Sequence, residues 1–175
     1  MAKGNFDACL KVILHHEGGF VNHSRDPGGM TNLGVTKATY EEWIGHPVSE
    51  AIMRKLTPQL VAPLYKKKFW DMLKCDGLPK GLDLCVFDFG VNAGVKRSAK
   101  MLQRLVGVSD DGIIGPATLK AVEARKAVIG AHALITFFQA ERRVYYRSLT
   151  HFPTFGKGWL RRVDAVEKTA QEMAK

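Results

Sequence analysis

The chain has 175 residues, of which 46% are hydrophobic and 25% are charged. This balance is typical of a folded protein with one domain or two small lobes, and it excludes a disordered chain. No stretch approaches the ~20 apolar residues of a membrane-spanning helix. The formal net charge of +9 indicates an anionic partner, for which a cell wall, an outer-membrane surface and nucleic acid all qualify.

The first predicted element is a helix that begins after a plausible N-cap, Asn5, and ends at the Gly18-Gly19 pair. Glu17 lies three residues after Leu14 and four after Ile13, so its side chain continues the apolar stripe of this helix. That stripe faces the core and is formed by Phe6, Cys9, Leu10, Ile13 and Leu14.

Residues 19–36 are rich in glycine and contain Pro27, which predicts a turn-rich hairpin or loop with short strands at 20–21 and 33–35. Segment 82–93 is the most apolar of the chain and is expected to be the central buried helix. The fold expected is therefore mainly α, with one small β-hairpin near the N-terminus. The predicted helices after the hairpin lie at 36–43, 49–56, 57–70, 82–93, 99–106, from 116 onward, 127–149 and 158–174.

The cysteines, Cys9, Cys75 and Cys85, are odd in number and lack the paired spacing of a metal site. We expect buried, reduced thiols and synthesis in a reducing cytoplasm. The first residues lack the apolar run of a signal peptide, and Lys11 interrupts the next candidate. If the target lies outside the membrane, another component must carry the protein there.

Two carboxyl groups in contrasting settings suggest acid–base chemistry. Glu17 lies at an apolar position at a helix C-terminus, where desolvation and the helix dipole both favour its neutral form. Asp26 lies on the polar loop, where it should stay ionised, and Thr31 offers a hydroxyl that can hold a water beside it. One buried acid and one solvated carboxylate are the pair that glycoside hydrolysis uses. The plainer alternative, that Glu17 caps a helix or pairs with an arginine and that Asp26 belongs to a simple turn, stays open on spacing alone.

The order of these residues resembles a known family. The segment His16-Glu17-Gly-Gly-Phe20, followed by Asp26-Pro-Gly-Gly-Met-Thr31-Asn-Leu-Gly-Val-Thr36, is similar to the signature of glycoside hydrolase family 108, N-acetylmuramidases of phage endolysins and secretion-linked muramidases. It also resembles the Glu…Asp…Thr arrangement of phage T4-type lysozymes, with one residue fewer between the aspartate and the threonine. This departure weakens the role of Thr31 more than that of Glu17.

The second half carries further similarity, to the predicted peptidoglycan-binding region that is usual in this family. The similar segments are Asp88-Phe-Gly-Val-Asn92-Ala-Gly94, Leu102-Gln-Arg-Leu105 and Asp111-Gly-Ile-Ile-Gly-Pro-Ala-Thr-Leu119. Two later segments look like the C-terminal end of the family, Arg142-Arg-Val-Tyr145-Tyr146 and Gly158-Trp159-Leu-Arg-Arg162-Val.

The resemblance implies a lysozyme-like, two-lobed helical fold, with a catalytic region at 1–91 and a peptidoglycan-binding-like region at 92–175 that pack as one unit. It implies hydrolysis of the β-1,4 bond from N-acetylmuramic acid to N-acetylglucosamine, with Glu17 as general acid, Asp26 as the base that activates water and Thr31 as its helper. An inverting reaction is expected, which places the two carboxyl groups ~6.5–9.5 Å apart rather than ~5 Å. The expected substrate-binding residues are Asn92, Tyr145, Tyr146, Trp159 and Arg162.

The implied biological role is cell lysis by a phage or prophage endolysin, made in the bacterial cytoplasm and acting in the periplasm or cell wall after release through a membrane pore. A muramidase that serves a secretion system and a wall-binding module without catalysis are the alternatives. We expect a monomer. The basic C-terminal residues suit a solvated surface or, more sharply, a surface that engages wall carboxylates or outer-membrane phosphates.

Two other functions are less well supported. His15, His16 and His23 lie near both carboxyl groups, but they lack the i, i+4 histidine pair of a helical zinc site, so we expect an enzyme without metal or cofactor. Residues 99–125 look like a helix-turn-helix, yet acidic residues such as Asp110 and Glu123 interrupt their positive charge, which argues against nucleic acid as a partner. The aromatic residues named above are more often core than ligand platforms.

Overall fold

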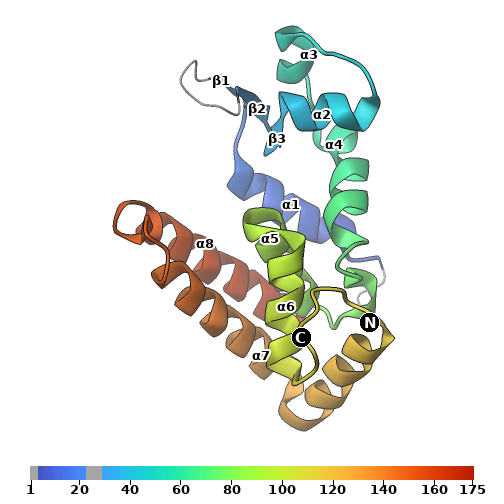
Figure 1. The fold of residues 1–175 in the computed structure, drawn as a ribbon, viewed down its shortest axis with the longest axis vertical. Helices are drawn as coiled ribbons and strands as arrows, with labels where there is room; N and C mark the ends of the chain where they lie inside the picture. The colour runs from blue at the N-terminus through green and yellow to red at the C-terminus, as the bar shows by residue number, and fades with distance from the viewer. Residues whose placement is uncertain (1–3, 23–28) are drawn as a thin grey trace. The chain divides into compact units, whose positions relative to one another are not determined.

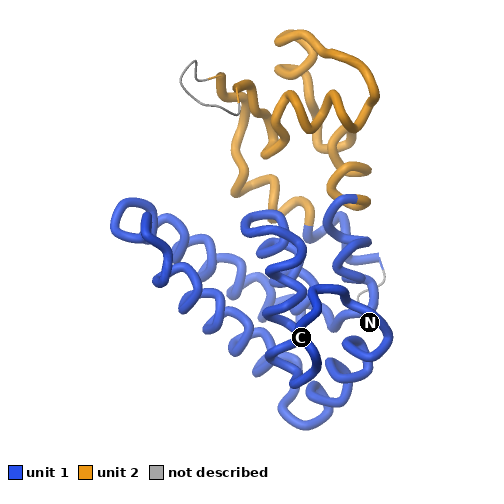
Figure 2. The backbone as a smooth tube through the Cα atoms, viewed as in Figure 1, with its two compact units in different colours: residues 1–9, 68–175 blue, residues 10–67 orange. Residues whose placement is uncertain are grey.

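The computed structural model describes residues 4–22 and 29–175. The chain divides into two compact units, a smaller one of residues 10–67 and a larger one of residues 1–9 with 68–175 (Figure 2). Neither unit follows the predicted division at residues 91 and 92, and that boundary stays a prediction. No described helix combines the length and the apolar character that crossing a membrane requires.

The smaller unit combines short helices with a small sheet (Figure 1). Its first helix begins in the larger unit at Phe6 and ends at Glu17, as predicted, and Gly18 follows with a φ of 79° that terminates it. The elements are α1 (Phe6–Glu17), β1 (Val21–Asn22), β2 (Met30–Asn32), β3 (Val35–Thr36), α2 (Lys37–Ile44), α3 (Glu50–Arg54), α4 (Pro58–Tyr65) and a π-helical segment (Lys66–Trp70).

The sheet is antiparallel in the order β1-β2-β3, so it has one strand more than the predicted hairpin. Asn32 and Val35 face each other across a two-residue turn formed by Leu33 and Gly34, whose φ values are 50° and 74°. Two successive residues with positive φ make the tight hairpin turn whose twist matches that of the flanking strands. The predicted strand at 33–35 is therefore wrong at Leu33 and Gly34, and β3 begins only at Val35.

Three predicted helix starts in this unit are confirmed by side-chain capping. The hydroxyl oxygens of Thr36, Ser49 and Thr57 each accept a hydrogen bond from the backbone N–H three residues later, at the starts of α2, α3 and α4. The ends were predicted less well. The helix from Ser49 stops at Arg54 rather than at residue 56, and the predicted helix 57–70 changes from α to π geometry after Tyr65.

The described part of the larger unit consists of helices joined by turns and loops, without a strand. Helix α5 is buried from Leu82 to Gly90 and contacts α6, α7 and α8, which confirms it as the predicted central helix. Helices α7 and α8 run side by side in Figure 1. The elements are a 3₁₀ turn (Cys75–Gly77), α5 (Leu82–Ala93), α6 (Val95–Val106), α7 (Pro116–Arg147) and α8 (Phe152–Met173).

Several boundaries in this unit differ from the sequence prediction, as in α6, which begins at Val95 rather than at residue 99. The helices predicted from Pro116 and from residue 127 follow one another through a kink at Gly130, whose φ of 83° is not helical. Helix α8 begins at Phe152, six residues before the predicted start, because Pro153 occupies its first turn, where proline needs no N–H partner.

The core confirms the expected state of the cysteines. Cys9, Cys75 and Cys85 are free and buried, and burial raises the pKa of each thiol above its ordinary value. Nearby, the rings of Phe6, Trp70 and Phe87 pack with centroids 5.3–6.0 Å apart.

Candidate active site

Glu17 occupies the last position of α1, and the packing of that helix determines where its carboxyl group lies. Ile13 and Leu14, one turn earlier on the same face, are 0% and 9% exposed. Glu17 is half-buried, and its Oε1 atom is shielded from solvent. The stripe predicted from the sequence therefore does carry the carboxyl group towards the interior of the smaller unit.

Gly34 lies directly against this carboxyl group. A Cβ atom built on Gly34 would lie 2.8 Å from both Cγ and Oε2 of Glu17 and 2.5 Å from the phenol oxygen of Tyr65. Real side chains do not tolerate such distances, and the φ of 74° already favours glycine. Only glycine allows the hairpin turn, Glu17 and Tyr65 to come together as they do.

Tyr65 is the third residue of this group. It ends α4, is 1% exposed, and its hydroxyl donates a 2.8 Å hydrogen bond to the carbonyl oxygen of Leu33. Leu33 has a φ of 50°, a conformation that costs energy for a residue with a branched side chain. The bond from Tyr65 thus stabilises the strained turn that faces Glu17.

These two contributors were not identified by the sequence analysis. Gly34 lay within the motif that carries the family resemblance, and its signal was a glycine inside a short predicted strand. Tyr65 gave no signal, because it is separated from Leu33 by 32 residues and meets it only through the packing of α4.

Of the other two residues predicted for the reaction, the structure describes only Thr31. Thr31 is half-buried on β2, opposite Val21 on β1 and Thr36 on β3. Its neighbour Asn32 projects to the opposite face and donates a 2.8 Å hydrogen bond to the carbonyl of Met53. Asp26, like His23, lies outside the described residues.

Comparison with known proteins assigns the chain to a family. The profile of Glycosyl hydrolase 108 matches residues 10–94, and that of a Predicted Peptidoglycan domain matches residues 97–164. The structure of Brucella abortus SagA matches with a TM-score of 0.85 and 38% sequence identity, over 99% of this chain and 98% of that chain. The chain belongs to glycosyl hydrolase family 108. No curated protein matches it.

Membership of family 108 decides several expectations. The protein is a glycoside hydrolase of peptidoglycan with a lysozyme-like, mainly helical fold, as the sequence resemblance implied. The alternative of a wall-binding module without catalysis is therefore excluded. The roles of individual residues do not follow from membership alone.

The five residues predicted to bind substrate all lie in the larger unit of this family 108 enzyme. The Tyr146 ring lies 5.4 Å from those of both Tyr145 and Trp159, and its hydroxyl donates to Oδ1 of Asn92. Asn92 is exposed and Tyr145 and Trp159 are half-buried, whereas Tyr146 is 3% exposed. Burial raises the pKa of Tyr146, so its phenol stays protonated and serves as a donor.

Arg162, the fifth of these residues, belongs to a buried ion network. Its guanidinium lies 2.8 Å from Asp88, and that of Arg142 lies 2.6 Å from the same carboxylate, with Asp88 and Arg142 wholly buried. Burial alone would raise the pKa of Asp88, but the two guanidinium groups outweigh it and hold the pKa below its ordinary value. Arg162 therefore stabilises the fold. Binding of substrate by these five residues stays a prediction.

Within residues 4–22 and 29–175, no group of three or more His, Cys, Asp and Glu side chains is arranged to hold a metal ion. His15 and His16 pack edge to face, with ring centroids 5.7 Å apart. Because His23 and Asp26 lie outside these ranges, the expectation of an enzyme without metal stays a prediction.

Proposed function

We propose that the chain is an N-acetylmuramidase, which hydrolyses the β-1,4 bond from N-acetylmuramic acid to N-acetylglucosamine. Glu17 is the general acid, and Asp26 is the base that positions or activates water. The observation that carries this proposal is the place of the Glu17 carboxyl group, at the end of α1 against Gly34 and beside Tyr65. Membership of family 108 supports the class of reaction.

In the proposed reaction, Glu17 donates its proton to the bridging oxygen as the bond from that oxygen to C1 of the muramic acid breaks. A water molecule adds to C1 and loses its proton to Asp26, while Thr31 accepts or donates a hydrogen bond that orients the water. The products are a chain with a new reducing-end muramic acid and a chain with a free 4-hydroxyl on glucosamine. Glu17 ends ionised and Asp26 protonated, and exchange with solvent restores both.

The surroundings of Glu17 suit an acid whose position must be exact to a fraction of an ångström. The backbone of Gly34 restricts the conformations of its side chain, and Tyr65 is fixed by its bond to Leu33. A carboxyl group held this way loses little entropy on reaching the productive geometry, which is how positioning contributes to rate. A freely rotating surface glutamate has no such advantage.

The experiment that tests the bond is product analysis. Purified peptidoglycan is digested, reduced with borohydride and analysed by mass spectrometry. The proposal predicts fragments that end in muramitol. Fragments that end in glucosaminitol would show a glucosaminidase, anhydro ends a transglycosylase, and released peptides an amidase, and each of these results contradicts the proposal.

The role of the second carboxylate needs its own variant. Asp26→Asn should lower the rate of hydrolysis by ~10²–10⁴-fold, the usual contribution of a general base, and leave the melting temperature unchanged. Asp71→Asn, another aspartate outside the proposed site, is the matched control and should keep the wild-type rate. An Asp26→Asn variant with normal activity would remove this residue from the mechanism.

We further propose that the biological role is lysis by a phage or prophage endolysin that reaches the periplasm through a membrane pore. The net charge of +9 suits rapid association with an anionic wall, which supports this role. Producing the protein in a bacterial host with and without a pore-forming partner tests it, since lysis should require the pore. A muramidase that serves a secretion system is the alternative, and loss of secretion on deleting the gene would establish that role instead.

Two smaller elements complete the proposal. The enzyme acts as a monomer, which sedimentation measures directly. Exposed basic residues of the C-terminal region, Arg147, Lys157 and Arg161, support contact with the anionic outer-membrane surface. Changing these three residues to Gln should weaken binding to lipopolysaccharide vesicles at low salt, and unchanged binding would contradict this contact.

A further inference from the structure

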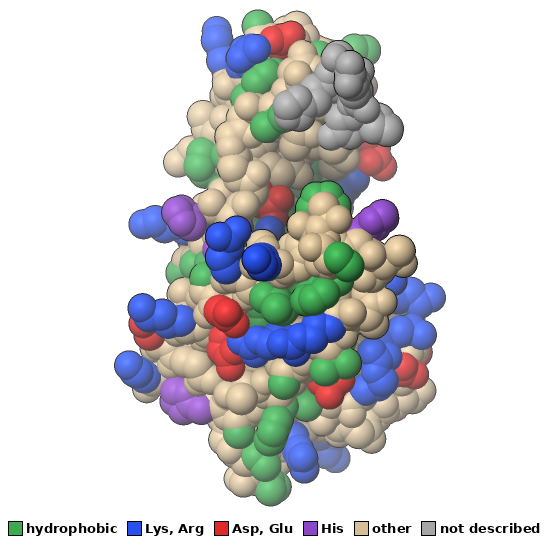
Figure 3. All heavy atoms as spheres, turned by 90° about the vertical axis from the view of Figure 1, so that its left-hand side faces the viewer, with side chains coloured by type: hydrophobic (Ala, Val, Ile, Leu, Met, Phe, Trp, Pro, Cys, Tyr) green, Lys and Arg blue, Asp and Glu red, His purple; other side chains and the backbone are tan. Residues whose placement is uncertain are grey.

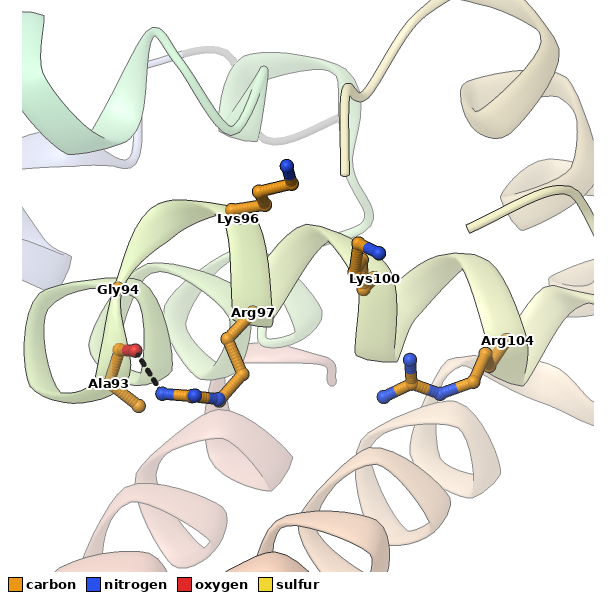
Figure 4. Close-up of a pocket in the computed structure, with 6 residues that line it drawn as sticks. All are labelled: Ala93, Gly94, Lys96, Arg97, Lys100 and Arg104. Carbon is orange, nitrogen blue, oxygen red and sulfur yellow. Dashed lines mark hydrogen bonds between the residues drawn. The ribbon is translucent and has the colours of Figure 1, made fainter. Parts of the chain in front are cut away.

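A pocket of about 470 Å³ lies along α6 in the larger unit. Four of its six lining residues are cationic, and none is acidic. They come from three successive turns of one helix, as Figure 4 shows. The lining residues are Ala93, Gly94, Lys96, Arg97, Lys100 and Arg104.

The cations of this pocket, which we call the α6 basic pocket, are only weakly neutralised. Among the described residues, Lys96 and Lys100 form no ion pair, although the charge of Lys100 helps to lower the pKa of Asp110 and of Asp111. Arg104 lies 2.8 Å from Asp110, but both side chains are exposed, at 56% and 44%, so solvent screens this pair. Three positive charges therefore remain available to an anionic ligand.

Arg97 is held in place by contacts other than an ion pair, as far as the described residues show. It donates a 2.9 Å hydrogen bond to the carbonyl of Ala93, and its guanidinium lies 4.9 Å from the centre of the Tyr145 ring. Figure 4 shows the guanidinium groups of Arg97 and Arg104 on the same side of α6. A guanidinium fixed by a ring and a carbonyl still presents the donors that carboxylates bind.

The opposite face of α6 anchors the helix to the core. The Ser98 hydroxyl donates a 2.7 Å bond to the carbonyl of Val86, and Gln103 is 1% exposed and bonds to both Asp111 and Thr118. No side chain caps the start of the helix at Gly94, and a Cβ atom there would meet nothing within 4 Å. The first backbone N–H groups add partial positive charge at the same end of the pocket.

The positive surface charge of the protein does not by itself identify this pocket. Figure 3 shows one face on which Lys and Arg side chains are scattered among acidic and hydrophobic ones. The α6 basic pocket differs because four cations line one hollow, and the carboxylates near them, Asp110 and Asp111, are not among its lining residues. The helix rises ~12 Å from Lys96 to Arg104. This length exceeds the width of one phosphate group and is comparable to the separation of two carboxylates on an extended peptide.

We propose that the α6 basic pocket binds the free carboxylates of the peptide stem of peptidoglycan. This inference rests on the proposed function for its substrate, and it assigns the stem, rather than the glycan, to a site in the larger unit. Arg97 and Arg104 bind carboxylates with their planar donors, while Lys96 and Lys100 add charge. The enzyme thereby recognises peptide-bearing wall polymer in preference to bare glycan.

The test uses the full chain and a short probe, the tripeptide alanyl-γ-glutamyl-diaminopimelate, added in an NMR titration of backbone amide shifts. The expected result is shifts at α6 and a Kd that rises ~10-fold in Lys96→Gln/Lys100→Gln, the scale of two partly exposed charges. The matched control, Lys120→Gln/Lys168→Gln, removes the same charge from exposed positions of the same unit and should bind like wild type. A tripeptide whose carboxylates are amidated should bind ~10-fold more weakly.

Three results would overturn the proposal: no shifts at α6, equal weakening in the two double variants, or inorganic phosphate binding there more tightly than the peptide. The last result would point to phosphate groups of a lipid or wall polymer as the ligand. Because the titration requires no hydrolysis, its failure leaves the muramidase proposal intact, and an inactive enzyme that still binds the tripeptide would leave the pocket assigned.

Discussion

Two carboxyl groups, one in each compact unit, have contrasting surroundings. Asp88 lies in the middle of α5, is wholly buried, and is bound by the guanidinium groups of Arg142 and Arg162. Glu17 lies at the end of α1, is half-buried, and rests against the backbone of Gly34. The two guanidinium groups hold the pKa of Asp88 below its ordinary value, so this carboxyl group is ionised at neutral pH and offers no proton there. The comparison shows that burial alone does not identify a catalytic acid, because the groups that contact a carboxyl group decide whether it holds a proton.

The sharpest way to break this comparison is to remove the charge of Asp88. Asp88→Asn leaves two guanidinium groups in the core without their counter-charge and should lower the free energy of unfolding by about 3–5 kcal/mol. Urea denaturation measures this loss. Asp164→Asn, which removes an exposed partner of Arg143, is the control and should cost less than about 1 kcal/mol. Equal small losses in both variants would mean that the network does not stabilise the fold.

Gly34→Ala tests the contact on the Glu17 side. The new methyl group must displace Glu17 or Tyr65, so the rate of hydrolysis should fall by ~10²-fold, and the positive φ should cost about 1 kcal/mol of stability. Gly45→Ala is a matched control, because its φ of 83° imposes similar strain while a Cβ there meets nothing within 4 Å. That variant should lose stability and keep its activity. If both variants are equally active, Gly34 has no role in placing the acid.

Tyr65→Phe removes one hydrogen bond and leaves the ring. The turn at Leu33 loses its 2.8 Å donor, which should cost about 1 kcal/mol of stability and lower kcat ~10-fold with little change in KM. Tyr40→Phe, at another buried tyrosine of the same unit, controls for loss of a phenol and should keep kcat. A rise in KM with normal kcat would show that Tyr65 acts on substrate binding instead.

The smallest predicted effect is a pH dependence of stability. The pKa of Asp88 is lower in the folded chain than its ordinary value of about 3.9. The contribution of the ionised carboxylate to the free energy of unfolding is therefore complete above that value and is lost as pH falls through the folded pKa. The stability difference between wild type and Asp88→Asn should stay constant from pH 7 to ~5 and narrow below pH ~4. A difference that widens in acid would contradict the lowered pKa.

The parts of the fold that could be predicted are those that local sequence determines. The stripe of α1, the caps at Thr36, Ser49 and Thr57, and the apolar run of α5 all follow from side chains close together in the chain. Strand β2 and the turn at Leu33 and Gly34 were missed because two- or three-residue strands have no clear periodicity and a leucine with positive φ is rare.

The candidate site divides in the same way. Helical spacing placed Glu17 on the buried face, and the structure confirms that position. Tyr65 reaches the turn only through the packing of α4, and the contact between Glu17 and Gly34 depends on how a hairpin folds back on a helix end, which local patterns do not encode. The Asp88 network likewise joins α5, α7 and α8, so the sequence showed its arginines as part of a basic C-terminal region.

The central claim is that the carboxyl group of Glu17 supplies the proton for bond cleavage. The most direct measurement is the rate at which Glu17→Gln releases fragments from purified peptidoglycan, beside Glu42→Gln as a control from an exposed position of the same unit. The account predicts a loss of ~10³-fold or more in Glu17→Gln, wild-type activity in Glu42→Gln, and unchanged melting temperatures in both. A Glu17→Gln enzyme that is folded and cleaves at a near-normal rate would contradict it.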